Sequence, residues 1–171
     1  MPKLYAPELT KDSCGFGLIA NIEGRASHKL VRNAITGLAR MQHRGAILAD
    51  GKTGDGCGIS LQMPQQFFQT ISKEMGLPLP EHFAVGMVFF PQDKQKVTVL
   101  KNIIQQELEQ ETLPAIGWRE VPINKSVLGD IAASSLPWIQ QIFIAAPPGW
   151  KAKDVERRLF MARRRIEKKI N

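Results

Sequence analysis

The residue of this sequence best suited to act as a nucleophile is Cys14. It follows a polar segment and precedes the apolar and small residues "GFGLIANI". A thiol attacks only as the thiolate, and its ordinary pKa of about 8.5 means that it needs a base nearby. The α-amino group of a chain terminus, with a pKa of about 7.7, is such a base at neutral pH. Nucleophilic catalysis by Cys14 through its own amine would therefore require removal of residues 1–13, and Gly15 and Gly17 would let a substrate approach the backbone.

Other interpretations of this region are a packing thiol, a metal ligand and a nucleotide site. Free cysteines are commonly buried, so a structural role for Cys14 stays open. Two cysteines, with His28 and His43 nearby, are too few for a metal cage, and we expect no metal. The run "GFGLIA" matches G-x-G-x-x-A, but it precedes a predicted strand and opens no helix, which disfavours a nucleotide site. "DGKTGDG" lacks calcium ligands at the positions of Lys52 and Leu61.

The elements that must position Cys14 follow from hydrophobic periodicity and turn residues. Period-3.6 patterns predict helices over 27–44, capped by Ser27 and stopped by Gly45, over 93–111, and over the basic segment 151–171. Residues 49–56 have the composition of a turn. Strands are predicted over 14–22, 57–63, 82–90, 116–123 and 138–146. Because helices and strands mix without strict alternation, the sequence predicts an α+β fold.

The net charge of +7 is concentrated in residues 151–171, which hold nine Lys and Arg against three acids. Such a segment could form a nucleic-acid-binding module. The pattern favours instead an amphipathic helix whose apolar stripe faces the core, formed by Val155, Leu159, Ala162, Ile166 and Ile170. We therefore expect no nucleic-acid partner. No apolar run is long enough to span a membrane, and residues 1–13 lack the apolar region of a secretory signal, so we expect a cytoplasmic protein without a membrane partner.

A longer pattern resembles a known family. The run "CGFGLIANIEGRASHKLVRNAITGLARMQHRGAILADGKTGDGCGI" is similar to the start of class II glutamine amidotransferase domains, which are N-terminal-nucleophile enzymes. It resembles most the glutamate synthase large (alpha) subunits, and the likeness continues through "GWREVP", "LPWIQQIFIAAP" and "ERRLFMARRRIEKK".

The resemblance assigns roles to individual residues. It implies that Cys14 becomes the first residue after removal of leader 1–13 and attacks the side-chain amide of glutamine. Arg44 and Gly45 would position Cys14 and shape the glutamine pocket, although an arginine at a helix C-terminus also favours the helix dipole. We expect His43 to be structural, Asp55 to lie in a turn and Cys57 to be a small core residue.

The resemblance also implies a fold and partners. The family fold is a four-layer αββα sandwich, and residues 14–171 correspond to its N-terminal part. The family motifs "RFST", "NGE" and "SDSS" for the oxyanion hole and the glutamine clamp do not occur in this sequence. We therefore expect an incomplete sandwich, no cofactor in this chain and an inactive isolated chain. A non-catalytic interaction role stays open. The full-length family enzymes carry FMN and an iron–sulfur cluster, and the bacterial ones work with a small (beta) subunit; the electron donor stays open among NADPH, NADH and ferredoxin.

Overall fold

The computed structural model describes residues 15–170, which form an α+β structure divided into two compact units. Unit 1 comprises Met1–Gln62, described from residue 15, together with Lys125–Ser134. Unit 2 comprises Met63–Asn124 and Ser135–Asn171, described to residue 170. Cys14 and the proposed leader 1–13 lie outside the described residues.

Unit 2 is built on an antiparallel sheet of order β1-β3-β2, with β1 at Phe83–Phe90, β2 at Ala115–Glu120 and β3 at Trp138–Ala145. The strands predicted over 82–90, 116–123 and 138–146 are thus confirmed, although β2 ends before Pro122, which has no N–H to donate. The central position of β3 explains why its residues are mostly apolar, because a strand with neighbours on both edges is the most buried part of a sheet.

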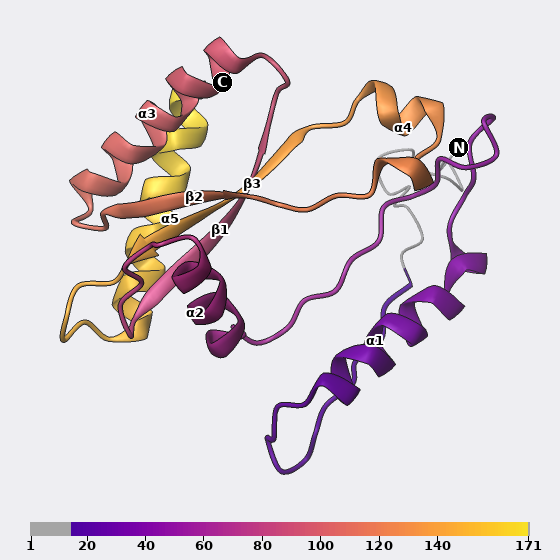
Figure 1. The fold of residues 1–171 in the computed structure, drawn as a ribbon, viewed down its shortest axis with the longest axis horizontal. Helices are drawn as coiled ribbons and strands as arrows, with labels where there is room; N and C mark the ends of the chain where they lie inside the picture. Colours follow the sequence, from indigo (N-terminus) through magenta and orange to yellow (C-terminus); the bar gives the residue numbers. More distant parts are fainter. Residues whose placement is uncertain (1–14, 171) are drawn as a thin grey trace, which may run out of the picture. The chain divides into compact units, whose positions relative to one another are not determined.

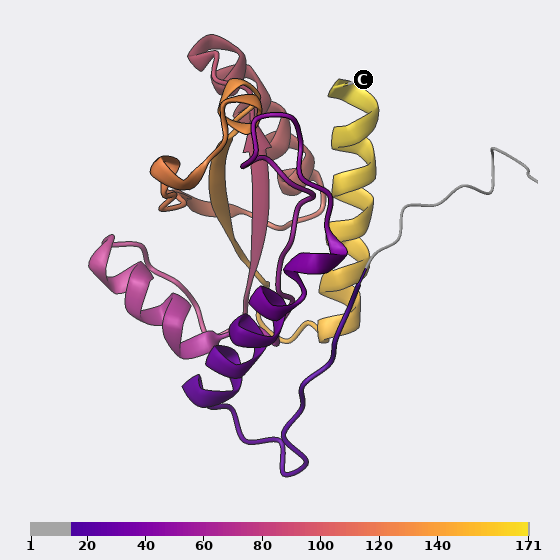
Figure 2. The ribbon, with the colours of Figure 1, turned by 90° about the vertical axis from the view of Figure 1, so that its right-hand side faces the viewer.

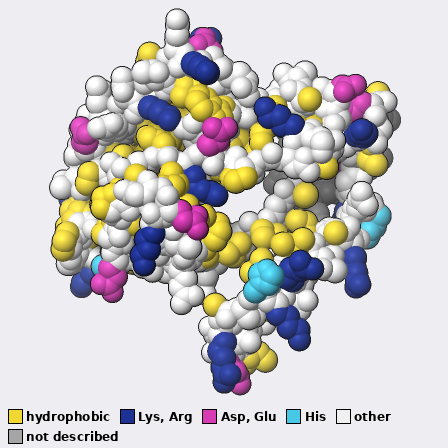
Figure 3. All heavy atoms as spheres, viewed as in Figure 1, with side chains coloured by type: hydrophobic (Ala, Val, Ile, Leu, Met, Phe, Trp, Pro, Cys, Tyr) yellow, Lys and Arg dark blue, Asp and Glu magenta, His cyan; other side chains and the backbone are white. Residues whose placement is uncertain are grey.

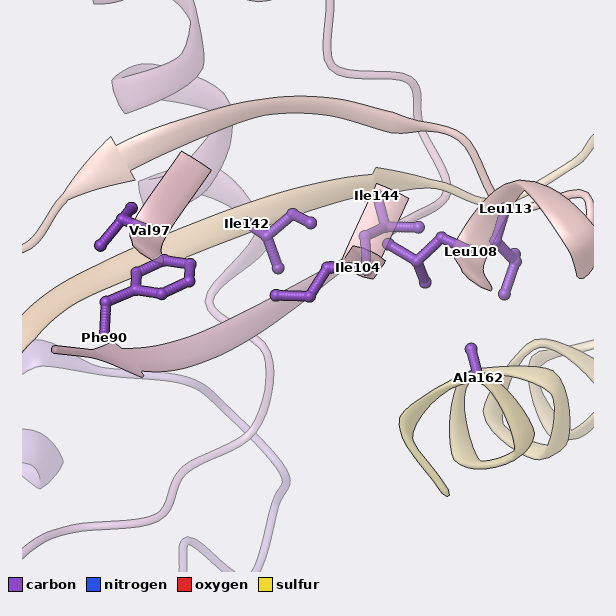
Figure 4. Close-up of a cluster of buried hydrophobic side chains, with 8 residues drawn as sticks. All are labelled: Phe90, Val97, Ile104, Leu108, Leu113, Ile142, Ile144 and Ala162. Atoms are coloured by element: carbon purple, nitrogen blue, oxygen red, sulfur yellow. The ribbon is translucent and has the colours of Figure 1, made fainter. Parts of the chain in front are cut away.

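Helices α3 (Lys94–Gln110) and α5 (Ala152–Ile170) cover one face of this sheet (Figures 1 and 2). Asp93 caps α3, since its carboxylate accepts the N–H groups of Gln95 and Lys96. Figure 4 shows the resulting core, in which side chains of the two helices face those of the strands. Its buried members are Phe90, Val97, Ile104, Leu108, Leu113, Ile142, Ile144 and Ala162.

The opposite face of the sheet is only partly covered. Helix α2 (Gln65–Glu74), which the sequence pattern did not predict, places Phe68 against Phe83 and Phe143 with ring centroids 6.3 and 5.8 Å away. Further along β1 on this face, Met87 is 50% exposed and Phe89 62% exposed. The sheet therefore has one completed face and one apolar face that is partly open.

A buried carboxylate ties α3 to α5. The side chain of Glu107 is 1% exposed and binds Arg165 Nε at 2.7 Å and the ammonium of Lys169. Glu111 binds Arg165 Nη2 at 2.7 Å and Arg158 Nη1 at 3.1 Å. The hydrogen bonds from Lys169 and Arg165 hold the pKa of Glu107 below its ordinary range, and the bond from Arg165 does the same for the pKa of Glu111.

Unit 1 contains α1 (His28–Arg40), the 3-10 turns η2 (Gln42–Arg44) and η3 (Lys125–Val127), and the short helix α4 (Asp130–Ser134). The predicted Ser27 cap is confirmed, since its hydroxyl accepts the N–H of Leu30 at 3.2 Å. The predicted helix over 27–44 is one turn too long, because the chain tightens into η2 after Arg40.

The strands predicted over 14–22 and 57–63 are wrong for the described residues, which contain no strand in either segment. Their alternating apolar pattern is suited to a sheet, but no described strand pairs with them, and unpaired segments form no ladder. Cys57, expected in the core, is exposed for the same reason.

Truncation of Phe143 tests which phenylalanine side chains form the core of unit 2. Phe143 is fully buried, whereas Phe89 on the same sheet face is 62% exposed. We expect Phe143→Ala to lower the free energy of unfolding by about 3–5 kcal/mol, because it leaves a cavity. Phe89→Ala is the matched control and should change it by less than about 0.5 kcal/mol. Urea unfolding followed by tryptophan fluorescence measures both values, and equal effects would contradict this assignment of the core.

The ion pairs of Glu107 and Glu111 predict a loss of stability in acid. Because both folded-state pKa values lie below the ordinary 4.5, the stabilisation is complete above pH 4.5 and is lost as the pH falls through the folded values. Glu107→Gln should lower the midpoint of thermal unfolding at neutral pH by several degrees and weaken its dependence on acid. Calorimetry across this pH range tests the change. Glu109→Gln, an exposed neighbour on α3, should leave both properties as they are.

Candidate functional site

The predicted nucleophile Cys14 lies outside the described residues, but its neighbour Gly15 is described. A Cβ built on Gly15 would lie 2.6 Å from Met41 Cε and 3.4 Å from Arg44 Cγ. A side chain at position 15 would therefore displace the flexible end of Met41 and would lie in van der Waals contact with Arg44. The structure thus places Gly15, the residue after Cys14 in the sequence, close to the side chain of Arg44.

The end of α1 positions Arg44 and Gly45. The N–H of Met41 donates to Leu38 O at 3.0 Å, and the N–H of Arg44 donates to Met41 O at 2.8 Å, which closes the turn η2. Gly45 then continues in an extended conformation, with φ −100° and ψ 152°. Nδ1 of His43 lies 3.2 Å from Arg40 O, which agrees with a structural role for this histidine. Arg44 and Gly45 are both exposed.

A hairpin-like turn over residues 46–55 holds the chain directly after Gly45. The carboxylate of Asp55 accepts the N–H of Ala46 at 2.9 Å, and the N–H of Asp55 donates to Ala46 O at 3.2 Å. An isolated bridge joins Ile47 to Gly54. The turn composition of residues 49–56 predicted this reversal, and the position of Asp55 within it is confirmed. Asp55 therefore fixes the backbone that leaves the arginine–glycine pair.

Asp50 at the tip of this turn fastens a segment that is remote in sequence. Its carboxylate accepts the N–H of Lys52 at 3.1 Å, the N–H of Thr53 at 2.8 Å and the N–H of Ile131 at 3.1 Å, and it also accepts the Thr53 hydroxyl. These bonds, the Thr53 hydroxyl foremost, hold the pKa of Asp50 far below its ordinary value.

Thr53 and Gly129 complete the contact. The Thr53 hydroxyl oxygen accepts the N–H of Ala132 at 3.1 Å, so Asp50 and Thr53 together cap the start of α4. A Cβ at Gly129 would overlap Asp50 Oδ2 and Thr53 Oγ1. We call the group Asp50, Thr53, Gly129, Ile131 and Ala132 the latch. Sequence reasoning missed it, because its two halves are separated by more than 70 residues and only the turn half carries a local signal.

The basic charge of α5 is largely used within the protein. Arg158, Arg165 and Lys169 bind the glutamates of α3. Arg163 and Arg164 both bind Glu167. The predicted apolar stripe is confirmed from Val155 to Ile166, since these side chains pack on the core, while Ile170 is 46% exposed. This arrangement favours the structural interpretation of the basic helix over a nucleic-acid surface.

Among residues 15–170, no group of three or more His, Cys, Asp or Glu side chains is placed to hold a metal ion. Two open hollows lie along α5, one lined by Met161, Arg164, Arg165, Glu167 and Lys168 and the other by residues from Gly149 to Arg158. Neither is lined by Arg44 or Gly45. Within the same described range, every helix is too short or too polar to cross a bilayer.

Comparison with known proteins agrees with the resemblance found in the sequence. A family model described as class-II glutamine amidotransferases matches residues 14–171. The glutamate synthase [NADPH] large chain of Bacillus subtilis is 38% identical over 171 residues, which cover 98% of this chain and 11% of that protein.

Two further relatives show the same pattern. The glutamate synthase [NADPH] large chain of Azospirillum brasilense is 39% identical over 97% of this chain and 11% of its own length. The ferredoxin-dependent glutamate synthase 2 of Synechocystis is 38% identical over 94% of this chain and 10% of its own. The chain thus spans about a tenth of the length of these relatives.

Removal of the Asp50 carboxylate should open the latch. In Asp50→Ala the N–H of Ile131 loses the Asp50 carboxylate and Thr53 loses the group that orients its hydroxyl, so we expect amide exchange at Ile131 and Ala132 to rise about tenfold or more. Hydrogen exchange read by mass spectrometry or NMR measures this. The matched control is Glu23→Ala, which removes an exposed carboxylate of unit 1 that pairs with exposed Arg25. Unchanged exchange at residues 131 and 132 would contradict the latch.

Proposed function

The chain belongs to the class II glutamine amidotransferases, and we propose that it carries the nucleophile-bearing part of the amidotransferase domain of a glutamate synthase large subunit. The observation that carries the proposal is the extent of the family match, which begins at Cys14 and includes the Arg44–Gly45 pair. The contact of Gly15 with Arg44 supports it, because it brings the pair next to the residue that follows the nucleophile.

The proposed chemistry is nucleophilic catalysis by Cys14 after removal of residues 1–13. The freed α-amino group accepts the thiol proton, and the sulfur attacks the side-chain amide carbon of glutamine. The carbon–nitrogen bond then breaks, the leaving nitrogen takes the proton and departs as ammonia, and a γ-glutamyl thioester remains. Water hydrolyses the thioester to glutamate and restores the thiol. In the full-length enzyme the ammonia is used to make glutamate from 2-oxoglutarate.

Arg44 and Gly45 act as positioning residues in this proposal. The Cβ and Cγ of Arg44 lie close to Gly15, so removal of the Arg44 side chain takes away packing next to the backbone that follows the nucleophile. Gly45 leaves η2 in an extended conformation and is followed directly by Ala46, whose N–H is held by Asp55. Together these contacts give the edge of the glutamine pocket a defined backbone.

We propose that the complete domain is the four-layer αββα sandwich of its family. Unit 2 supports this, because α3 and α5 cover one face of its sheet while the other exposes Met87 and Phe89. A sheet that is apolar on both faces needs a layer on each. A second sheet packed on the open face would bury these side chains and supply the missing inner layer.

We propose that the cofactors and the partner subunit of the longer relatives bind outside the part of the protein that this chain represents. Iron–sulfur clusters are held by cysteine thiolates, and two cysteines in the whole sequence do not fit such a cluster. Residues 15–20 open no helix that could receive the phosphate of a flavin. We propose that FMN, the cluster and the small (beta) subunit of the bacterial enzymes bind elsewhere in the full-length protein, in the cytoplasm. The relatives' names include both NADPH and ferredoxin, so the electron donor is not assigned.

The proposal is tested in a chimera in which this chain replaces the matched segment of the Bacillus subtilis large chain. We expect mature enzyme that begins at Cys14 and releases ammonia from glutamine, no release after Cys14→Ala, and a loss of roughly 10²-fold in kcat after Arg44→Ala, which removes the Cγ beside Gly15 and so misplaces the site. Arg40→Ala, at an exposed arginine one turn earlier, should have no effect.

Intact mass and an ammonia assay provide the readouts. An active chimera that keeps Ser13 attached would refute the terminal-amine mechanism. The 171-residue chain assayed alone is expected to release no ammonia, because the oxyanion-hole and clamp motifs are absent from its sequence. Release by the isolated chain that disappears in Cys14→Ala would contradict this expectation.

A further inference from the structure

The turn that follows Gly45 is held by polar contacts and not by apolar packing. Among the described residues of unit 1 no hydrophobic side chain is buried, and Figure 3 shows hydrophobic side chains at the surface over α1. Within residues 42–63, Asp50 and Thr53 are the two that are partly buried, and all others are exposed. Because apolar burial contributes little here, the position of this turn depends on the hydrogen bonds of the latch.

Backbone hydrogen bonds connect the latch to Gly45. The N–H of Leu48 donates to Thr53 O at 2.7 Å, and the N–H of Asp55 donates to Ala46 O at 3.2 Å, so the two arms of the turn are joined to each other. The Asp55 carboxylate closes the base by accepting the N–H of Ala46 at 2.9 Å. The two arms therefore move together. Gly45 has no side chain to restrict its dihedral angles, so the turn can rotate about it unless its tip is held.

The Asp50 carboxylate is fully used within the latch. It accepts the N–H groups of Lys52, Thr53 and Ile131 and the Thr53 hydroxyl. These donors occupy the roughly four acceptor positions of a carboxylate. The same bonds hold the pKa of Asp50 far below its ordinary value, so at neutral pH it is ionised and does not act as an acid. Any effect of Asp50 on a reaction must therefore be exerted through the position of the turn.

We propose that Asp50 and Thr53 are positioning residues for glutamine hydrolysis, because the latch stops the turn from rotating about Gly45 and so fixes the edge of the glutamine pocket. This inference rests on the proposed function, in which Arg44 and Gly45 form that edge. The other half of the latch belongs to the connection between β2 and β3, which lies far from the pair in the sequence. Loss of the latch loosens glutamine binding and leaves the reacting groups at Cys14 in place.

The experiment measures glutamine hydrolysis by the chimera with the Bacillus subtilis large chain. We expect Asp50→Ala and Thr53→Val each to raise KM for glutamine about tenfold and to change kcat by less than about threefold, because binding is loosened while the chemistry is retained. Thr53→Ser keeps the hydroxyl and should keep the KM. The double variant Asp50→Ala/Thr53→Val should raise KM no more than either single change, since both remove the same fastening.

Gly129→Ala tests the latch from its other half. A Cβ at position 129 would overlap Asp50 Oδ2 and Thr53 Oγ1 and would lie 2.8 Å from the backbone nitrogen of Thr53. It should therefore push the two halves apart and raise KM as Asp50→Ala does. Gly37→Ala is the matched control, because a Cβ at position 37 meets no atom within 4 Å. This variant should leave KM unchanged.

Amide exchange in the same chimera gives a readout that does not depend on activity. Exchange at Ala46 and Leu48 should rise about fivefold or more in Asp50→Ala and in Thr53→Val, but not in Thr53→Ser. An unchanged KM, a fall in kcat alone, an equal rise of KM in Thr53→Ser or Gly37→Ala, or unchanged exchange at Ala46 would overturn the positioning role. A mere loss of folded enzyme lowers the apparent kcat and leaves KM as it is, so it is distinguished from positioning.

Cys14→Ala separates this inference from the proposed function. Ammonia release that persists in Cys14→Ala, or that is absent from the chimera without substitutions, would overturn the proposed function. Exchange at Ala46 and Leu48 then decides by itself whether the latch positions the turn. Ammonia release that depends on Cys14 together with a KM that is insensitive to Asp50→Ala would overturn the positioning role and leave the proposed function standing.

Discussion

Every backbone N–H and C=O of a strand needs a hydrogen-bond partner, and the two units of this protein differ in how far this requirement is met. In unit 2 the central strand β3 pairs with β1 along its whole length and with β2 across a bulge between Ala115 and Gly117. Once paired, the strands present continuous apolar faces, and α3 and α5 can cover one of them. In unit 1 the comparable segments, residues 15–20 and 56–62, have no such pairing with a described residue, and their large apolar side chains are exposed. Pairing precedes burial here, because a face exists only after the strands that form it have joined.

A pairing of buried charges likewise explains why the basic helix α5 packs against the core. Burying Glu107 between two helices costs desolvation energy that only close cations can offset, and Arg165 and Lys169 occupy those positions. The stripe from Val155 to Ile166 faces the sheet at the same time. The charge that makes the segment look like a binding surface in the sequence is therefore tied to the packing of α5 on α3. Net charge per segment is a poor guide to partners when the opposite charges lie elsewhere in the chain.

The sequence predicts what is local and misses what depends on distant partners. Periodicity locates β1, β2, β3, α3 and α5, and the serine before α1 and the turn after Gly45 are predicted by their residue types. Residues 57–63 alternate as well as any strand, yet form none, since alternation describes a face and not the neighbour that must pair with it. The cap that Asp50 gives to Ile131 has no sequence signal, because the cap and the helix are 81 residues apart.

The candidate site is held by contacts that are local in the sequence and by one long-range pair, Asp50 with Ile131. Gly15 lies against Arg44, Arg44 is held by the turn after α1, and Asp55 and Asp50 fix the chain that follows. Apart from the packing of Arg44 beside Gly15, these steps use backbone groups or short polar side chains, and none uses a buried apolar one. A site built this way can keep its local geometry while the apolar side chains around it are exposed to solvent. Its working dielectric and its exclusion of water depend on the layer that covers it, because hydrogen bonds and charges act strongly only after water has been displaced. Local order at the candidate site is thus separate from the burial of apolar side chains, of which unit 1 has none among its described residues.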